Sequence, residues 1–288
     1  MPESAAAGQQ GREPFGSRLA AAMAARGPLC VGIDPHPGLL ADWGLNDDVA
    51  GLERFSLTVV EAVATLAAAV KPQVALYERH GSAGMAVLER TLEAASDAGV
   101  LSIADAKRGD IGSTMAAYAD AWLRDGSALA ADSVTLSPYL GFESLRPALD
   151  LAAESGRGVF VLALTSNPEG KSVQHVGGSE SVARRIAESA ADENRRYSGT
   201  MGSVGLVVGA TIGTALVDLG LDLDAVRGPI LAPGLGAQGA TPADLRATFA
   251  AAYPAVLATS SRGILAAGPT IAGLRSATEA TRDGLLEG

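Results

Sequence analysis

Ile103-Ala-Asp-Ala-Lys-Arg-Gly-Asp-Ile-Gly-Ser-Thr114 places two carboxylates and one ammonium group within six positions at the end of an apolar run. Side chains alternate between the two faces of a strand, so Asp105 and Lys107 point the same way and Asp110 lies beyond the strand end. Buried charges are costly unless they pair with one another. The stretch therefore predicts a charged functional site at a strand end. The alternative is a structural ion pair that only closes the strand.

Runs of the same apolar, β-branched kind recur along the whole chain and predict eight strands. They cover residues 29–34, 69–74, 101–107, 133–139, 158–164, 203–210, 229–235 and 255–261. Segments with helical spacing lie between most of them, at 52–68, 83–98, 114–125, 142–154 and 179–198. Strands that alternate with helices predict a parallel sheet. Eight strands that are apolar on both faces predict an α/β fold closed into a (β/α)8 TIM barrel rather than an open sheet.

The ends of the chain fit a single barrel domain. Residues 1–13 are polar and glycine-rich and lack the apolar core of a signal peptide, so we expect a flexible tail. Residues 14–25 predict an extra helix before the first strand, and 269–286 predict the closing helix. With 288 residues, 48% of them hydrophobic, the chain suits one barrel of about 250 residues. The predicted domain is residues 14–288.

The composition excludes several classes of partner. A net charge of −10 and a sequence pI of about 4.8 argue against binding of nucleic acid or an anionic membrane. No stretch reaches the ~18 apolar residues of a membrane span. The single cysteine, Cys30, allows no disulfide within the chain and lies in an apolar run, so we expect a buried small side chain rather than a nucleophile. These features favour a cytoplasmic protein.

Lysine is unusually rare in this chain. Of the 22 basic residues, only Lys71, Lys107 and Lys171 are lysines. Lysine is compact and can release its proton, whereas arginine stays charged on a broad planar group. Lys107 lies in the opening stretch and Lys71 in another predicted strand, which indicates a chemical role for both. The alternative is that the three lysines survive by chance. For Lys171, in the loop 167–178 after the fifth predicted strand, two interpretations stay open: a residue of a lid over the barrel mouth, or a solvated side chain.

In a barrel of this type the active site lies at the C-terminal ends of the strands. Polar and glycine-rich residues reach that rim from at least five predicted strands: Asp34, Lys71, Asp105, Lys107, Ser166, Asn167, the segment 233–239 and Arg262. Scattered surface charge would not gather at one rim, so this pattern predicts an active site there.

Two loops at this rim predict a phosphate site. Pro233-Gly-Leu-Gly-Ala-Gln-Gly239 follows the seventh strand, and Ser260-Ser-Arg-Gly263 follows the eighth. Glycines let backbone N–H groups approach an anion, and Arg262 can donate two hydrogen bonds to phosphate oxygens. The loops after strands seven and eight form the recurrent phosphate site of this barrel. The alternative for the glycine-rich loop alone is a tight turn.

Together these motifs resemble the orotidine 5′-monophosphate (OMP) decarboxylase family, and especially its longer bacterial subgroup, type 2. The resemblance runs from about residue 15 to 285 and rests on Asp105-Ala-Lys-Arg-Gly-Asp-Ile111, Lys71, Thr165-Ser-Asn-Pro168, the segment 233–239, Arg262 and Val31-Gly-Ile-Asp-Pro-His-Pro37. It implies a homodimer of barrels that converts OMP to uridine 5′-monophosphate (UMP) and carbon dioxide. This reaction is the last step of de novo pyrimidine biosynthesis, and the resemblance implies no metal and no organic cofactor.

The same resemblance implies a role for each matching residue. Lys71, Asp105, Lys107 and Asp110 would form a network of alternating charge, with Asp110 contributed by the neighbouring subunit. Ile111 and Thr114 would cross the dimer interface with it. The expected substrate contacts are Asp34 to the ribose hydroxyls, Ser166 to the pyrimidine edge, and Gln238 and Arg262 to the phosphate. Further substrate-binding positions are expected at Asn167, Pro233, Gly236, Gly239, Ser261 and Gly263.

Two alternative functions use the same scaffold. One is a Mg²⁺-dependent decarboxylase of the 3-keto-gulonate 6-phosphate type, which binds its metal through acids on the early strands. Lys71 argues against it, since an ammonium group there would displace the metal. The other is a non-catalytic sensor of phosphoribosyl ligands. It would keep Asp34, Gln238 and Arg262 but has no need of Lys107 and Asp110.

Overall fold

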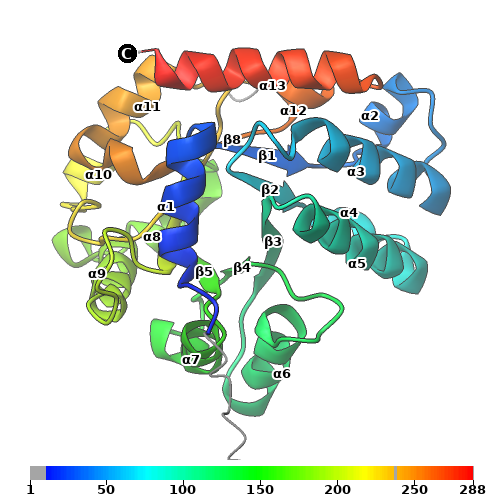
Figure 1. The fold of residues 1–288 in the computed structure, drawn as a ribbon. Coiled ribbons are helices and arrows are strands. Elements are labelled where there is room, and N and C mark those ends of the chain that lie inside the picture. The colour runs from blue at the N-terminus through cyan, green and yellow to red at the C-terminus, as the bar shows by residue number, and fades with distance from the viewer. Residues whose placement is uncertain (1–10, 237–238, 288) are drawn as a thin grey trace, which may run out of the picture.

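A computed structural model describes residues 11–236 and 239–287 and shows a closed barrel of parallel strands (Figure 1). Each strand pairs with the next in the chain, and β1 pairs with β8 to close the barrel. The strands are β1 (Leu29–Ile33), β2 (Ala69–Pro72), β3 (Leu101–Arg108), β4 (Ser133–Leu136), β5 (Gly158–Leu164), β6 (Val204–Val208), β7 (Ile230–Pro233) and β8 (Val256–Ser260). The predicted (β/α)8 barrel and all eight predicted strands are confirmed.

Helices surround the barrel and bury their apolar faces against it. The longer ones are α3 (Val49–Val63), α5 (Gly81–Asp97), α6 (Gly112–Leu123), α7 (Arg146–Glu154), α9 (Val182–Asn194), α11 (Pro242–Phe249) and α13 (Ile271–Leu286). Short helices, which the sequence did not predict, are α2 (Pro37–Asp42), α4 (Ala75–Glu78), α8 (Lys171–Gln174), α10 (Ala215–Asp218) and α12 (Arg262–Leu265). Among the described residues, 3₁₀ turns also occur at Phe142–Leu145, Pro168–Gly170, Gly178–Glu180 and Ala250–Ala255.

Helix α11 begins at a capping box formed by Thr241 and Asp244. The Thr241 hydroxyl accepts a hydrogen bond from Asp244 N (3.2 Å), and the Asp244 carboxylate accepts one from Thr241 N (2.8 Å). Pro242 occupies the first turn, where its missing N–H costs nothing. This reciprocal capping fixes the start of the helix that follows the loop after β7.

The extra helix α1 (Phe15–Arg26) crosses one end of the barrel, in front of the strands in Figure 1. Its Phe15 and Leu19 side chains are fully buried, and the Phe15 ring packs edge-on against Phe160 at 6.0 Å between centroids. A Cβ atom on Gly158, the first residue of β5, would lie 2.2 Å from the Phe15 ring, so Phe15 lies over the N-terminal strand ends. This packing closes the N-terminal end and leaves the C-terminal end as the mouth.

Cys30 belongs to the cluster of side chains inside the barrel. Its side chain is fully buried, and burial raises the pKa of its thiol to about 12. A thiol with this pKa stays protonated at neutral pH and is a poor nucleophile. The prediction that Cys30 is a buried side chain is confirmed.

The predicted tail, residues 1–13, lies mostly outside the described residues. Arg12, near its end, pairs with Asp125 at 2.9 Å and donates a hydrogen bond to the Ser155 carbonyl at 2.7 Å. In the described part of the chain, no helix is long and apolar enough to cross a membrane.

Candidate active site

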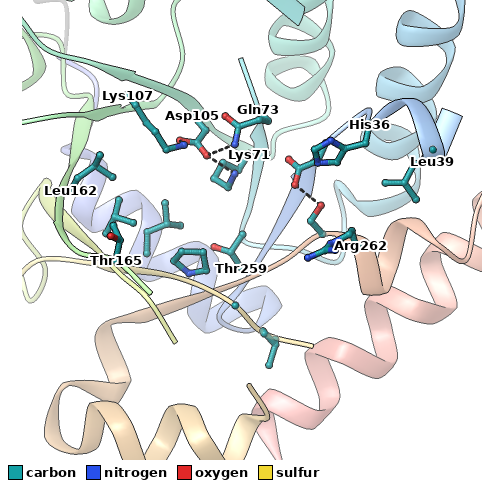
Figure 2. A pocket seen from close by; sticks show the side chains of 18 of the residues that line it. His36, Leu39, Lys71, Gln73, Asp105, Lys107, Leu162, Thr165, Thr259 and Arg262 are labelled. Atoms are coloured by element: carbon teal, nitrogen blue, oxygen red, sulfur yellow. Dashed lines mark hydrogen bonds and ion pairs between the residues drawn. The ribbon is translucent and has the colours of Figure 1, made fainter. Parts of the chain in front are cut away.

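A cavity of about 850 Å³ opens at the C-terminal ends of the strands. Predicted site residues in, or just after, five strands (β1, β2, β3, β7 and β8) line this cavity. They are Asp34, Lys71, Asp105, Lys107, Pro233, Ser261 and Arg262. Figure 2 shows Lys71, Lys107 and Gln73 directed toward Asp105, with Arg262 and His36 on the opposite wall. The predicted gathering of charge at one rim is therefore present in the folded chain.

Asp105 is the centre of this charged group. One carboxylate oxygen, Oδ2, accepts hydrogen bonds from Lys71 Nζ (2.8 Å) and Gln73 Nε2 (3.1 Å). The other, Oδ1, accepts from Lys107 Nζ (2.6 Å) and from the Thr135 hydroxyl (2.9 Å). Two cations and two neutral donors on one carboxylate compensate for its removal from water.

Burial and charge act in opposite directions on this group. Burial alone would raise the pKa of Asp105, but the Lys71 and Lys107 ammonium groups outweigh it and hold that pKa well below its usual range. Burial alone would lower the pKa of Lys71, but the carboxylates of Asp105 and Asp34 outweigh it and raise that pKa. Both groups therefore stay charged at neutral pH.

The backbone around Lys107 is distorted. The register between β3 and β4 shifts between Ala104 and Arg108, and Lys107 has φ of +48°, in the left-handed region. Among the described residues other than glycine, a positive φ occurs only at Lys107, Arg227 and Ala250. Such conformations persist where the surroundings enforce them, and they concentrate at functional sites. The prediction that Asp105 and Lys107 point to the same side is confirmed. A bulge, rather than a regular strand, places them there.

The opposite wall of the cavity carries Asp34 and the loop after β8. Asp34 Oδ2 accepts a hydrogen bond from the Ser261 hydroxyl at 2.6 Å, while its buried Oδ1 has no partner among the described residues. A Cβ atom on Gly32 would lie 2.9 Å from Ser261 Cβ, so glycine is required for this close approach. Arg262 is exposed at the mouth, where its guanidinium group can reach an anion.

The glycine-rich loop after β7 lies only partly in the cavity. Pro233 lines it together with Gly234 and Leu235. Gly236 and Gly239 do not, because the loop folds back on itself: Gly236 N donates to the Ala240 carbonyl (2.9 Å) and Gly239 N to the Gly236 carbonyl (2.8 Å). Gly263 is also outside the cavity lining. The predicted phosphate ligand Gln238 lies outside the described residues.

The loop after β5 contributes Thr165 to the main cavity, rather than the expected Ser166. Thr165 lines the main cavity, whereas Ser166 and Asn167 are exposed and line a separate cavity of about 280 Å³ beside Lys171. The side-chain amide of Gln174 binds both the N–H and the hydroxyl of Thr165, each at 2.8 Å. This pair of contacts fixes the loop so that Ser166 turns outward, and its contact with a pyrimidine stays a prediction.

Asp110, Ile111 and Thr114 do not line the cavity of their own chain. The Asp110 carboxylate accepts a hydrogen bond from Ile111 N at 2.7 Å, and no hydrogen bond or ion pair joins it to Lys107 among the described residues. Ile111 is 62% exposed, and Thr114 is exposed as well. The loop after β3 and the first turn of α6 therefore carry these three side chains away from the charged group that β3 supplies.

Several residues at the site were not predicted. Gln73 and Thr135 hold Asp105, and His36, Thr165 and Thr259 line the cavity. A signal existed for Gln73, which is two positions after Lys71 and so shares its strand face. Thr135 also breaks an apolar run at an inward position. Within the described residues, no three His, Cys, Asp or Glu side chains are grouped as metal ligands.

Comparison with known proteins adds an independent finding. Residues 27–277 match the model of the orotidine 5′-phosphate decarboxylase / HUMPS family. Orotidine 5′-phosphate decarboxylases from Streptomyces coelicolor and Salinispora arenicola are 58% and 59% identical over 93% of this chain and 95% of their own length. The structure of Leishmania donovani OMP decarboxylase has a TM-score of 0.76 at 31% identity, covering 95% of this chain and 98% of its own.

A crystal structure from Streptomyces avermitilis is more similar still, with a TM-score of 0.92 at 57% identity over 96% of both chains. The match therefore covers nearly the whole barrel. Sequence motifs, fold and relatives agree over nearly the whole length. This chain belongs to the orotidine 5′-phosphate decarboxylase family.

Proposed function

We propose that the cavity at the barrel mouth decarboxylates OMP, with Lys71, Asp105 and Lys107 as its charged centre and without a metal or organic cofactor. The reaction of the family yields UMP and carbon dioxide and completes de novo pyrimidine biosynthesis. The observation that carries the proposal is the buried Asp105 carboxylate between two ammonium groups, 2.8 and 2.6 Å away, on the cavity wall.

The chemistry requires this kind of centre. When the bond between C6 and the carboxylate breaks, the electron pair stays on C6 in the plane of the ring and cannot spread into the π system. Preorganised charge must therefore stabilise it. Lys107 opposes the developing negative charge and then delivers its proton to C6. Asp105 holds Lys107 in place, and Lys71 keeps Asp105 ionised.

The rest of the cavity suits the ribose and phosphate. Asp34 has a buried oxygen free to accept a hydrogen bond from a ribose hydroxyl. Arg262, at the first residue of α12, can bind phosphate oxygens with its planar guanidinium group. The phosphate is remote from the bond that breaks, so its binding energy serves to orient the ring beside Lys107.

We further propose a homodimer in which Asp110, Ile111 and Thr114 complete the neighbour's site. The loops after β3 and β4 run together, since Ser137 N donates to the Arg108 carbonyl at 2.7 Å. Ile111 (62% exposed) follows β3, and Tyr139 (80%) and Leu140 (55%) follow the neighbouring strand β4. An apolar surface of this kind favours burial against a second copy of the chain. As an enzyme of nucleotide synthesis, the dimer would act in the cytoplasm.

The Mg²⁺-dependent alternative fits the site less well. The Lys71 ammonium group occupies the Oδ2 side of Asp105, where a metal ion held by that carboxylate would lie. The sensor alternative leaves the ion pair of Lys107 and Asp105 without a purpose. Neither alternative explains the strained backbone that brings Lys107 into the cavity.

A single assay tests the proposed reaction. Purified protein mixed with OMP should remove the orotate absorbance and release carbon dioxide and UMP, and EDTA should leave the rate unchanged. An unchanged absorbance would contradict the activity. Loss of activity in EDTA, restored by Mg²⁺, would instead favour the metal-dependent alternative.

Arg262→Ala should weaken the binding of UMP far more than the binding of uridine. A charge-assisted phosphate contact contributes roughly 1.5–3 kcal/mol, so we expect UMP affinity to fall about ten- to a hundredfold while uridine affinity stays unchanged. Isothermal titration calorimetry with both ligands measures this. Arg262→Lys should recover part of the UMP affinity, because it keeps the charge without the planar fork. Equal losses for both ligands would make Arg262 a structural residue.

A further inference from the structure

Thr135, on β4, forms hydrogen bonds with both Lys107 and Asp105, two residues of the proposed charged centre. It is 1% exposed and does not line the cavity. Its hydroxyl oxygen accepts a hydrogen bond from Lys107 N at 2.9 Å, and its hydroxyl donates to Asp105 Oδ1 at 2.9 Å. One side chain thus contacts the backbone of Lys107 and the carboxylate that pairs with the Lys107 ammonium group.

The bridge lies where the sheet is irregular. The residues between Ala104 and Arg108 oppose a shorter segment of β4, and Lys107 adopts φ of +48° within this shift. A left-handed conformation is unfavourable for a residue with a Cβ atom unless neighbouring contacts enforce it. The hydrogen bond from Lys107 N to Thr135 is such a contact, and it forms only with an acceptor at that position.

The hydroxyl also has a defined polarity. A threonine hydroxyl has one hydrogen, and here it donates that hydrogen in a hydrogen bond to the ionised Asp105 carboxylate. The lone pairs of the same oxygen then face the Lys107 N–H. Movement of Asp105 would therefore disturb the Lys107 backbone, and movement of that backbone would disturb Asp105.

We propose that Thr135 is a positioning residue for decarboxylation, holding the Lys107 backbone and the Asp105 carboxylate in the geometry from which Lys107 acts on C6. The inference rests on the proposed function and adds a role for a residue that does not reach the cavity. It predicts that loss of the hydroxyl lowers turnover and leaves ligand binding in place.

The chain offers matched variants for this test. Thr135→Val keeps the shape and removes both hydrogen bonds, whereas Thr135→Ser keeps the hydroxyl. Ser133 is two residues earlier on the same strand and therefore the same face, is fully buried, and its hydroxyl has no partner among the described residues. Ser133→Ala thus controls for the loss of a buried hydroxyl from β4 that does not contact Asp105.

Steady-state kinetics with OMP give the first measurement. We expect Thr135→Val to lower kcat about ten- to a hundredfold, the size of effect for a hydrogen bond to a charged group. The KM for OMP and the affinity for UMP should stay within about threefold of the unaltered protein, because Thr135 does not touch the cavity. Thr135→Ser should restore most of kcat, and Ser133→Ala should stay within about twofold. Circular dichroism melts verify that each variant is folded.

A kcat for Thr135→Val within threefold of the unaltered protein would overturn the proposal. A Thr135→Ser variant with a kcat as low as that of Thr135→Val would also overturn it. The same holds for a Ser133→Ala variant whose kcat falls as far. If kcat and UMP affinity fall together, Thr135 supports the whole site rather than positioning Lys107, and the proposal is again wrong.

Crystal structures give a second measurement that does not depend on turnover. In ligand-free Thr135→Val, Lys107 should leave the left-handed region or its Nζ should move away from Asp105 Oδ1, while Thr135→Ser should keep both. An unchanged Lys107 in Thr135→Val would refute the positioning role even if the unaltered protein proved inactive toward OMP. That inactivity would refute only the proposed function.

Discussion

Replacing Lys107 with alanine is expected to abolish the turnover of OMP while the barrel stays folded. Lys107 is the only cation beside Asp105 with a substantially exposed side chain among the described residues, at 46%, so it is the one positioned to reach substrate. Removing a preorganised charge of this kind costs at least ~10²–10³ in rate. Loss of the proton donor to C6 adds to this cost.

The fold should tolerate this change. Asp105 retains Lys71, Gln73 and Thr135 as donors, so the variant does not leave a buried carboxylate without partners. A thermal melt close to that of the unaltered protein and near-normal UMP affinity would show an intact site. Lys171→Ala is the matched control, because it removes a lysine that follows β5 and does not pair with Asp105.

Turnover by Lys107→Ala within tenfold of the unaltered protein would contradict the assignment of Lys107. An equal loss in Lys171→Ala would also contradict it, since the effect would then follow the loss of a positive charge rather than the pair with Asp105. Single-turnover measurements at saturating OMP separate the chemical step from binding.

Mixing two inactive variants is expected to restore activity if the active sites are shared. In a two-fold dimer of Lys107→Ala and Asp110→Ala chains, one site carries both lesions and the other carries none. Random exchange makes half of the dimers mixed, and each mixed dimer has one intact site of two. The mixture should therefore recover about a quarter of the normal activity.

A second mixture provides the control. Lys107 and Lys71 both contact Asp105 within one chain, so a mixed dimer of Lys107→Ala and Lys71→Ala chains has a lesion in each site. This mixture should stay inactive. Native mass spectrometry verifies exchange in both experiments. Recovery in neither mixture, with exchange demonstrated, would mean that Asp110 serves its own chain, and recovery in both would mean that the complementation is not specific to Asp110.

The structure refines the reason for expecting a shared site. Met115 and Ala119 of α6 are buried against their own barrel, so these apolar side chains do not need a second subunit to cover them. Exposed apolar side chains that a second subunit would cover are instead found at Ile111, Tyr139 and Leu140, on the loops after β3 and β4. Asp110 lies on the same loop as Ile111, with no partner in the charged group of its own chain.

The strands and the position of the site followed from local pattern alone. Each apolar run is long enough to specify a strand, and strands that are apolar on both faces require helices outside and packed side chains inside. Parallel strands place all their C-terminal ends together. Asp34, Lys71, Asp105 and Lys107 could therefore be assigned to one rim from their places in the runs, and they do line one cavity.

The geometry within that rim depended on contacts between segments distant in the sequence. Thr165 rather than Ser166 faces the cavity because the Gln174 amide, nine residues later, holds its N–H and hydroxyl. Lys107 reaches Asp105 through a bulge supported by Thr135, twenty-eight residues later in the chain. Periodicity specifies which face a side chain takes within a regular strand. Beyond the strand end, or within a bulge, orientation follows hydrogen bonds that form only once the barrel has brought the segments together.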